Sequence, residues 1–592
     1  MYSCDQYMKP AKRHLSVDKL WEDDTKRPRT SNENERVTFI EHLSNELFYE
    51  IFDYLDGRDL FYAFSNLNLH FESLIMSSKF RLKLHHCASH QELFDQDYQQ
   101  IIIPNKHRII SLHLWTPSQL LTNVVLHPID SSFSRLEALS LHGIKFKQVT
   151  SFLPCLTSLP SLSSLNICLN DVLSNSSTIY HLLFRLPNLK CSKLSARRYS
   201  LQNFISNTSN QPMTSIKQLI IDHPCNLHGL YDILPFTPKL RRLQCENLFP
   251  TYGNISKEIP LNIFNLTYCS ISLCYLKFDE FEIFIKKISS QLRVLCFNPC
   301  SDISYLDADR WERLITKHMP LLHTFQFKYH DAVFGYFEIQ PYHLFINRFT
   351  SPFWIERKWL FNIEIDFNHW SPLEIIFSIQ SNRKRWDNTD FIVTEQECMN
   401  IIKPISQLTV HECRIPHPAQ WFAHYIRFVS SLAKITCLHI EFKYFSIVVL
   451  VEFLHLLPHL DSLTLFIHFS NQNMKLTQEQ NNTIRAMPTM NQIMKINVEQ
   501  VFDLNHIDLF IDLCPRIEYI NIQCKDYIQL ESIIRLVLTK NNCNLQFLFF
   551  SIPIADDEMV QKIKAIISSE QSAVSFKIQR ISNKIYLQWE KH

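Results

Sequence analysis

The sequence predicts an α/β solenoid, in which a short helical module precedes a long array of repeated strand and helix segments. Three observations favour this fold. An apolar motif recurs along most of the 592-residue chain, prolines stand at a fixed place before it, and the glycines number only five. The length would also suit about four separate domains. The recurrence favours one continuous array, because repeats at a fixed period are the signature of solenoids.

Residues 1–36 are polar and are predicted to be a disordered leader. Two basic clusters with twelve residues between them lie in this leader, formed by Lys12, Arg13, Lys26, Arg27 and Arg29. Their spacing resembles a bipartite nuclear-import signal. A solvated basic tail has the same composition, so both interpretations stay open.

Residues 37–83 show short helical patterns with a break at Asp56-Gly57, which predicts a separate compact module. Within it, the chain resembles the F-box family, whose pattern is Leu-Pro-x-Glu, a hydrophobic pair, Ile-Phe-x-x-Leu, a short turn and Asp-Leu. The matching positions are Leu43, Glu46, Leu47, Ile51, Phe52, Leu55, Asp59 and Leu60.

Two positions depart from the family pattern, since Ser44 replaces the proline and Phe71 stands where tryptophan is common. Serine is a favourable N-cap for a helix that begins near Glu46. We expect Leu47, Ile51, Phe52 and Leu55 to form one apolar stripe, and Asp59 to cap the next helix.

A module of this size buries little surface by itself, so its apolar stripe would be stabilised by a partner. The resemblance implies that this partner is the Skp adaptor, and through it a cullin, in an SCF-type ubiquitin ligase. The chain would then be a substrate receptor and not an enzyme, because the bound ubiquitin-conjugating enzyme supplies the chemistry. The alternative is a scaffold whose F-box-like segment only caps the repeats.

After a predicted linker at 84–104, the array is expected to span 105–580, with a C-terminal tail at 581–592. Its motif is apolar-x-x-apolar-x-apolar, and the first eight copies follow one another at 24 to 27 residues. The clearer copies begin at Ile109, Leu136, Leu162, Ile216, Leu240, Leu292, Leu322, Ile435, Leu460, Ile517 and Leu545. Weaker copies begin at Leu189, Leu266, Leu360, Ile405, Ile493 and Ala573.

Proline gives an independent check on these registers. With 26 prolines in 592 residues, seventeen copies would by chance have fewer than one proline two residues before the motif. Six copies have it, at Pro160, Pro187, Pro238, Pro320, Pro458 and Pro515. Because proline cannot continue a helix and favours extended backbone before it, each repeat is predicted to run from helix through proline to strand.

The array resembles leucine-rich repeats of the helix-bearing kind, in which parallel strands line a concave face. The asparagine or cysteine expected three residues after the motif occurs only at Asn170, Cys300, Asn368 and Cys413. An aromatic-rich insertion is expected at 329–404. It is predicted to be a hairpin or a longer helical connection, which either plugs the core or binds a partner. Its aromatic residues include Phe334, Tyr336, Phe337, Tyr342, Phe345, Phe349, Phe353, Trp354 and Trp359.

Several classes of function are disfavoured by composition. The scattered glycines exclude Gly-rich nucleotide loops and the nucleophile elbow. A net charge of +1 argues against nucleic acid as the main partner, and no apolar stretch is long enough for a membrane span. The clusters His85-His86-Cys87 and His411-Glu412-Cys413 lack a second ligand pair, so we expect neither a metal nor a cofactor.

The seventeen cysteines include no CxxC pair, and the first residues of the sequence lack the apolar core of a secretory signal peptide. We therefore expect reduced thiols and an intracellular protein, cytoplasmic or nuclear. The side chains that flank the strand leucines should line the concave face and contact a protein substrate. These candidates are Trp115, Asp222, Arg242, Glu246, Lys328, Glu364, Asp366, His439 and Glu441.

Overall fold

The structure is a computed structural model of the chain. It describes residues 40, 43–77, 81–87, 96–115, 129–173, 175–199, 213–251, 265–300, 302–332, 347–366, 374–381, 406–411, 426–427, 429–430, 435–445, 447–469, 492–498, 504–524, 527–540, 544–552, 555–570, 576–581 and 583–589. The chain divides into two compact units between Phe80 and Arg81. We call them the helical unit and the sheet unit.

The helical unit contains three short helices: α1 (Asn45–Tyr54), α2 (Gly57–Phe64) and α3 (Leu69–Met76). Each begins at a side chain that accepts a backbone N–H of the first turn. Ser44 Oγ accepts from Leu47, Asp56 Oδ1 from Arg58 at 2.9 Å, and Asn68 Oδ1 from Phe71 at 2.9 Å. The expectation that Asp59 caps the second helix is wrong, because Asp56 is the cap and Asp59 lies in the first turn.

Aromatic rings form the core of this unit. Phe71, at the position where the family often has tryptophan, is fully buried, and its ring centroid lies 5.1 Å from those of Phe48 and Phe64. Phe64 lies 5.2 Å from Phe52. The three helices are therefore held together by one small cluster, completed by Leu60, Leu74 and Ile75.

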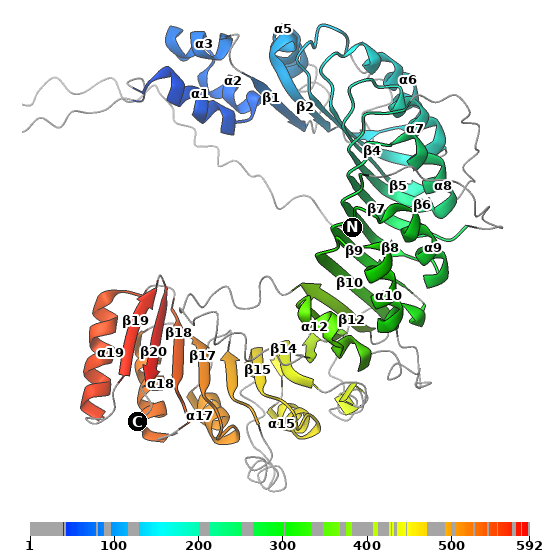
Figure 1. Cartoon of the computed structure of the whole chain (residues 1–592). Coiled ribbons are helices and arrows are strands. Elements are labelled where there is room, and N and C mark those ends of the chain that lie inside the picture. Colours follow the sequence, from blue (N-terminus) through cyan, green and yellow to red (C-terminus); the bar gives the residue numbers. More distant parts are fainter. Residues whose placement is uncertain are drawn as a thin grey trace, which may run out of the picture. The chain divides into compact units, whose positions relative to one another are not determined.

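The sheet unit contains a mostly parallel sheet of twenty strands with helices, an α/β arrangement (Figure 1). The strands are β1 (Leu82–Cys87), β2 (Ile109–Trp115), β3 (Ala138–Ile144), β4 (Ser164–Leu173), β5 (Cys191–Tyr199), β6 (Gln218–Asn226), β7 (Arg242–Phe249), β8 (Tyr268–Cys274), β9 (Val294–Pro299), β10 (Thr324–Ala332), β11 (Trp359–Asp366), β12 (Glu374–Ser381), β13 (Ser406–His411), β14 (Ile435–Phe445), β15 (Ser462–Phe469), β16 (Lys495–Val498), β17 (Tyr519–Gln523), β18 (Phe547–Ser551), β19 (Phe576–Ile581) and β20 (Lys584–Trp589). It is not closed into a barrel.

Helical segments follow most of these strands. Those of regular α form are α5 (Ile103–Asn105), α6 (Phe146–Phe152), α7 (Ser176–Phe184), α8 (Leu227–Ile233), α9 (Phe278–Ile288), α10 (Ala308–His318), α12 (Pro352–Glu356), α15 (Ile447–Leu456), α17 (Leu504–Leu513), α18 (Tyr527–Lys540) and α19 (Asp557–Glu570). The others are η3 (Tyr98–Ile102), η4 (Lys106–Arg108), η5 (Leu153–Ser158), η6 (Leu234–Phe236), η7 (Ile303–Leu306) and η8 (Asn347–Thr350). All six prolines before the motif follow within three residues of a helical end.

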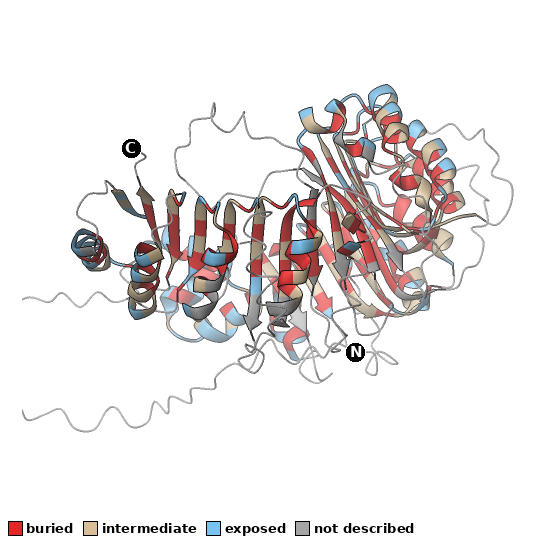
Figure 2. Ribbon diagram, turned by 90° about the horizontal axis from the view of Figure 1, so that it is seen from below, coloured by how far each residue is buried: buried red, intermediate tan, exposed pale blue. Residues whose placement is uncertain are grey.

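Strand register keeps the motif positions together. Leu139 of β3 pairs with Leu112 of β2 and with Leu165 of β4, and this matching continues along the parallel strands. The matched side chains are buried, whereas the alternate ones are only partly covered, as the banding along the strands in Figure 2 shows. The core therefore lies between the motif face of the sheet and the helices.

Three strands lie outside the copies of the motif. β12 pairs antiparallel with both β10 and β11, and β20 pairs antiparallel with both β18 and β19. The third, β1, pairs parallel with β2 and lies partly in the predicted linker. The predicted tail at 581–592 likewise contributes β20. The sequence did not predict these strands, because each lacks the three-position apolar spacing.

The insertion predicted at 329–404 contributes β11, β12 and α12. Phe349, Phe353, Trp354 and Trp359 are all buried, and the ring centroids of Phe349 and Trp354 are 4.8 Å apart. These aromatics fill the core, and β12 forms the hairpin. Of the aromatic residues predicted there, Phe334, Tyr336, Phe337, Tyr342 and Phe345 lie outside the described residues.

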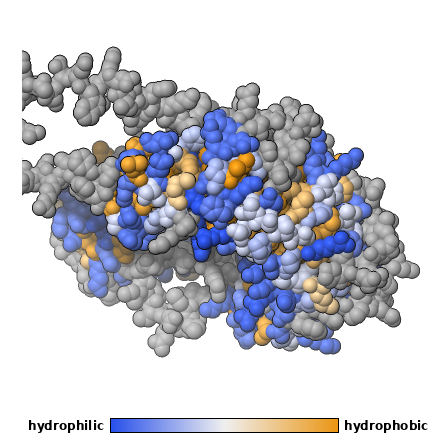
Figure 3. Space-filling model, turned by 90° about the horizontal axis from the view of Figure 1, so that it is seen from above, coloured by the Kyte–Doolittle hydropathy of each residue, from blue (hydrophilic) through white to orange (hydrophobic). Residues whose placement is uncertain are grey.

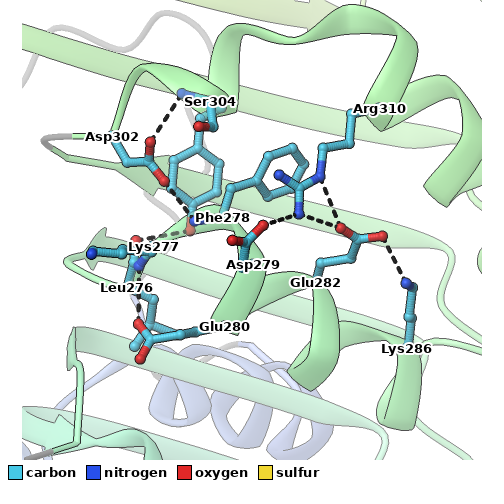
Figure 4. A network of polar contacts seen from close by, with 11 residues as sticks. Leu276, Lys277, Phe278, Asp279, Glu280, Glu282, Lys286, Asp302, Ser304 and Arg310 are labelled. Carbon is cyan, nitrogen blue, oxygen red and sulfur yellow. Dashed lines mark hydrogen bonds and ion pairs between the residues drawn. The ribbon is translucent and has the colours of Figure 1, made fainter.

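Neighbouring repeats are also linked on the helix side of the sheet. Arg310 of α10 donates from Nε to Glu282 of α9 at 2.8 Å and also binds Asp279 (Figure 4). Its guanidinium lies 4.3 Å from the Phe278 ring centroid. The backbone N–H of Phe278, which starts α9, donates to Asp302 of the following repeat at 2.7 Å. Helix α9 is thus fixed by the repeat after it.

Candidate functional site

Helix α1 carries apolar side chains on two sides. Phe48 and Phe52 face the core with 1 % exposure each, whereas Leu47, Ile51 and Leu55 are exposed by 45 %, 41 % and 36 %. Residues four apart lie on the same face of a helix, so Leu47, Ile51 and Leu55 form a second, outward row. We call this row, together with the exposed Leu43 that precedes the helix, the apolar stripe.

The sequence interpretation placed Phe52 in the same stripe as Ile51, and this is wrong. Successive residues of a helix are turned by about 100°, so Phe52 joins Phe48 on the inner side. Of the eight positions that match the F-box pattern, Phe52 and Leu60 are buried. The other six reach the surface: Leu43, Glu46, Leu47, Ile51, Leu55 and Asp59.

The helical unit also exposes apolar side chains that the sequence did not predict as site residues. Tyr54, at 91 % exposure, follows Ile51 by one helical turn, and this spacing was the signal that could have found it. The others are Tyr62, Leu67, Leu69 and Met76. Figure 3 shows apolar groups of this kind at the surface among hydrophilic ones. So much exposed apolar surface on three short helices is typical of a docking surface.

The second candidate region is the sheet face opposite the buried motif positions, which we call the polar face. The nine residues predicted to contact a substrate occupy its alternate strand positions, as the register of their strands requires. Trp115 is 42 % exposed at the end of β2. Asp366 ends β11, and its side chain lies outside the described part. The structure therefore distributes these residues over many strands instead of gathering them at one point.

Charges on the polar face are paired across neighbouring strands. Lys193 Nζ of β5 lies 3.0 Å from Asp222 Oδ2 of β6, and Ser195 Oγ donates to the same oxygen at 2.7 Å. Burial by itself would raise the pKa of Asp222, but these two hydrogen bonds outweigh it and lower the pKa. Asp222 is therefore an ionised, tightly held carboxylate.

Five more predicted residues take part in contacts further along the face. Lys328 Nζ lies 3.7 Å from Glu364 Oε2, and His439 Nε2 lies 3.0 Å from Glu441 Oε1. Arg242 places its guanidinium 4.3 Å from the Tyr268 ring centroid. Such mixed charges and stacked aromatics suit the contact surface of a protein.

The described residues include no group of three or more His, Cys, Asp or Glu side chains that could hold a metal ion. Burial raises the pKa of the Cys225, Cys269 and Cys274 thiols to about 12, so these thiols stay protonated and unreactive. The candidate import residues lie outside the described part of the chain.

No family model matches the chain, and no curated protein matches its sequence significantly. Among the described helices, none has the length and apolar character that crossing a bilayer requires. The apolar stripe and the polar face are therefore the two features of the structure that bear on function.

Proposed function

We propose that the chain is the substrate-recognition subunit of an SCF-type ubiquitin ligase. The helical unit is an F-box that binds the Skp adaptor through the apolar stripe. The sheet unit is a leucine-rich-repeat-like solenoid that holds a protein substrate on its polar face. The chain itself then needs no catalytic residue, because it acts by keeping the substrate near the activated ubiquitin.

The observation that supports this proposal is the second apolar row of α1. A helix that only completed its own core would need Phe48 and Phe52 and would have polar residues outside. Burying a fully exposed leucine or isoleucine contributes about 1.5 to 3 kcal/mol. The side chains of the stripe are less than half exposed, so a partner that covers them gains a part of this from each. The match of eight residues to the F-box pattern indicates which partner this is.

The test is binding of the purified full-length chain to a purified Skp adaptor, with and without Ile51→Asp. We expect at least about 100-fold weaker binding, because the aspartate places a charge in an apolar interface. Ile283→Asp is the matched control, since Ile283 is an isoleucine of helix α9 with nearly the same exposure, 42 %. It should bind as the wild type does.

Circular dichroism and thermal unfolding should show that both variants stay folded, since both residues are exposed. Unchanged adaptor binding by folded Ile51→Asp would refute the proposal. The scaffold alternative predicts a different result, in which Leu47→Asp lowers the unfolding temperature of the sheet unit because the stripe caps the repeats.

A further inference from the structure

Three histidines lie in a row across the first three strands of the sheet unit. The register pairs His85 of β1 with His113 of β2, and His142 of β3 is two residues beyond the partner of His113. The ring centroids of His85 and His113 are 5.5 Å apart, and those of His113 and His142 are 4.6 Å apart. We call these three residues the histidine row.

All three occupy the polar face, because they alternate with buried leucines such as Leu112 and Leu141. Around the row lie side chains that can donate or accept hydrogen bonds. Ser140 Oγ is 3.0 Å from His142 Nε2, and Asn166 Nδ2 donates to Ser140 Oγ at 2.9 Å. Trp115, opposite His142 in the register, adds an exposed aromatic surface.

The described charged side chains around the row are positive. On the polar-face positions of β1 to β5 whose side chains are described, the ionisable groups besides the histidines are Lys83, Lys193 and the thiols of Cys168 and Cys191. No carboxylate occurs at these positions. Asp222 on β6 is the first, and it is held by Lys193. The Asp171 carboxylate at the end of β4 accepts the N–H that starts α6, on the helix side.

Two members of the row, His113 and His142, resist protonation when nothing anionic is bound. Burial lowers the pKa of His113, and the neighbouring His142 and His85 lower it further. Burial also lowers the pKa of His142, with a contribution from Lys193. An anion over the row would offset both the repulsion and the lost hydration, so it would raise these pKa values. Binding of the anion and uptake of protons are therefore coupled.

We infer that the histidine row binds a carboxylate-rich segment of the substrate protein, in a contact that strengthens as the pH falls below 7. This deepens the proposed function, since it names the class of substrate that the polar face accepts. Carboxylates fit better than phosphates, because arginine, the usual partner of phosphate, is absent from the described polar-face positions of β1 to β4.

The experiment measures fluorescence anisotropy of a labelled ten-residue polyglutamate peptide with the full-length chain, at pH 7.5 and pH 6.0 and constant salt. Glutamate stays ionised at both values, so only the protein changes its charge. We expect the affinity to be about 10-fold higher at pH 6.0, as uptake of one proton over this range allows. A polyglutamine peptide should not bind.

His113→Gln should remove most of this pH dependence, and His85→Gln, at an exposed position, should reduce it without risk to the fold. His455→Gln is the matched control, because His455 is an exposed histidine of helix α15 and does not lie on the polar face. Equal affinity at the two pH values, or unchanged binding by both row variants, would overturn the inference. Tighter binding of a serine-phosphorylated peptide would overturn the choice of carboxylate.

The same protein preparations are tested for Skp binding. If they bind the adaptor but not polyglutamate, only the histidine-row inference fails. If they bind polyglutamate but not the adaptor, the acidic site stands and the ubiquitin-ligase role fails.

Discussion

Helix α1 of the helical unit and helix α9 of the sheet unit are of similar length but bury their apolar residues differently. Helix α9 buries Phe278, Phe281, Phe284, Ile285 and Ile288, and the one large apolar side chain that it exposes is Ile283. Helix α1 buries two phenylalanines and leaves Leu47, Ile51 and Leu55 exposed.

The difference follows from the number of neighbours that each helix has. Helix α9 contacts helix α10 and the strands of its own repeat, so its apolar side has packed surfaces around it. Within its unit, helix α1 packs against α3, and the small aromatic cluster uses only one side of it. Repetition lets the sheet unit complete its own core, whereas the helical unit leaves several apolar side chains exposed.

The largest expected effect is a difference in stability loss between substitutions at two adjacent residues of α1. Phe52→Ala should destabilise the helical unit by about 3 to 5 kcal/mol, because it removes a fully buried ring. Ile51→Ala should cost less than about 1 kcal/mol, because that side chain is already exposed. Hydrogen exchange of the α1 to α3 amides, followed by mass spectrometry, measures both. Similar losses of protection in the two variants would contradict the division of α1 into an inner and an outer side.

In the sheet unit, a buried contact between repeats should make stability depend on pH. His223 of β6 is buried, and its Nδ1 lies 3.0 Å from the Pro224 carbonyl, so this nitrogen must donate. Nε2 then accepts from the hydroxyl of Tyr180 on α7 at 2.8 Å. Burial lowers the pKa of His223 to about 4, so the folded protein holds the ring neutral.

The unfolded chain binds this proton near pH 6.5, so the contribution of His223 is complete above that value and is lost as the pH falls toward 4. Between pH 7.5 and pH 5 we expect a loss of about 2 kcal/mol in the free energy of unfolding. Urea titrations of His223→Gln should show a pH dependence smaller by that amount. Tyr180→Phe should keep the pH dependence, because His223 stays buried. Parallel pH curves for wild type and His223→Gln would argue against a neutral buried histidine.

Much of the sheet could be predicted from the sequence, because the motif states which side chains of each strand are buried. Every predicted copy begins within three residues of the start of a described strand, although Ile405 and Ala573 themselves lie outside the described residues. The antiparallel β12 could not be predicted in the same way. Its residues Ile375 to Ile379 are buried on both faces, so the strand shows neither the motif nor an alternation.

The candidate sites were predicted less completely. The F-box pattern drew attention to helix α1, but spacing alone did not separate the inward Phe52 from the outward Ile51, since both are apolar. The histidine row escaped notice because its members are 28 and 29 residues apart in the sequence, and only the strand register brings the rings together. In the sequence, the near neighbours of His85 are His86 and Cys87, which suggest a metal site and not a row of histidines across strands.

A smaller effect is expected from the charged link between α9 and α10. Arg310→Met should lower the free energy of unfolding by about 1 kcal/mol, because it leaves Glu282 and Asp279 without this cation in a partly exposed place. The loss should shrink in high salt, which screens exposed charges. Arg535→Met is the control, since Arg535 pairs with Glu531 within one helix. If the two variants lose equal stability, an ion pair between repeats contributes no more than an ion pair within one helix.

The smallest predicted effect concerns a hydrogen bond that recurs along the array. Where the proline ends a helix, its carbonyl accepts from a polar side chain of the next repeat. Asn188 Nδ2 donates to the Pro160 carbonyl at 2.7 Å, and Asn544 Nδ2 donates to that of Pro515 at 3.0 Å. Ser215 Oγ and Asn265 Nδ2 do the same for Pro187 and Pro238. These hydrogen bonds satisfy backbone carbonyls between repeats. They occur in an array in which few strands are followed by the asparagine or cysteine that the repeat pattern predicts.

Asn188→Ala should lower the free energy of unfolding by about 0.5 to 1 kcal/mol. The loss is small because water can partly replace the lost donor at the Pro160 carbonyl. Asn544→Ala, more than 350 residues further along the chain, should cost a similar amount. Urea midpoints of the two single variants and of the double variant measure this, and the two losses should add because the sites share no partner. Urea midpoints equal to that of the wild type would mean that this hydrogen bond adds no measurable stability. Proline alone would then position the strand, and the sheet hydrogen bonds and the buried core would account for the contact between repeats.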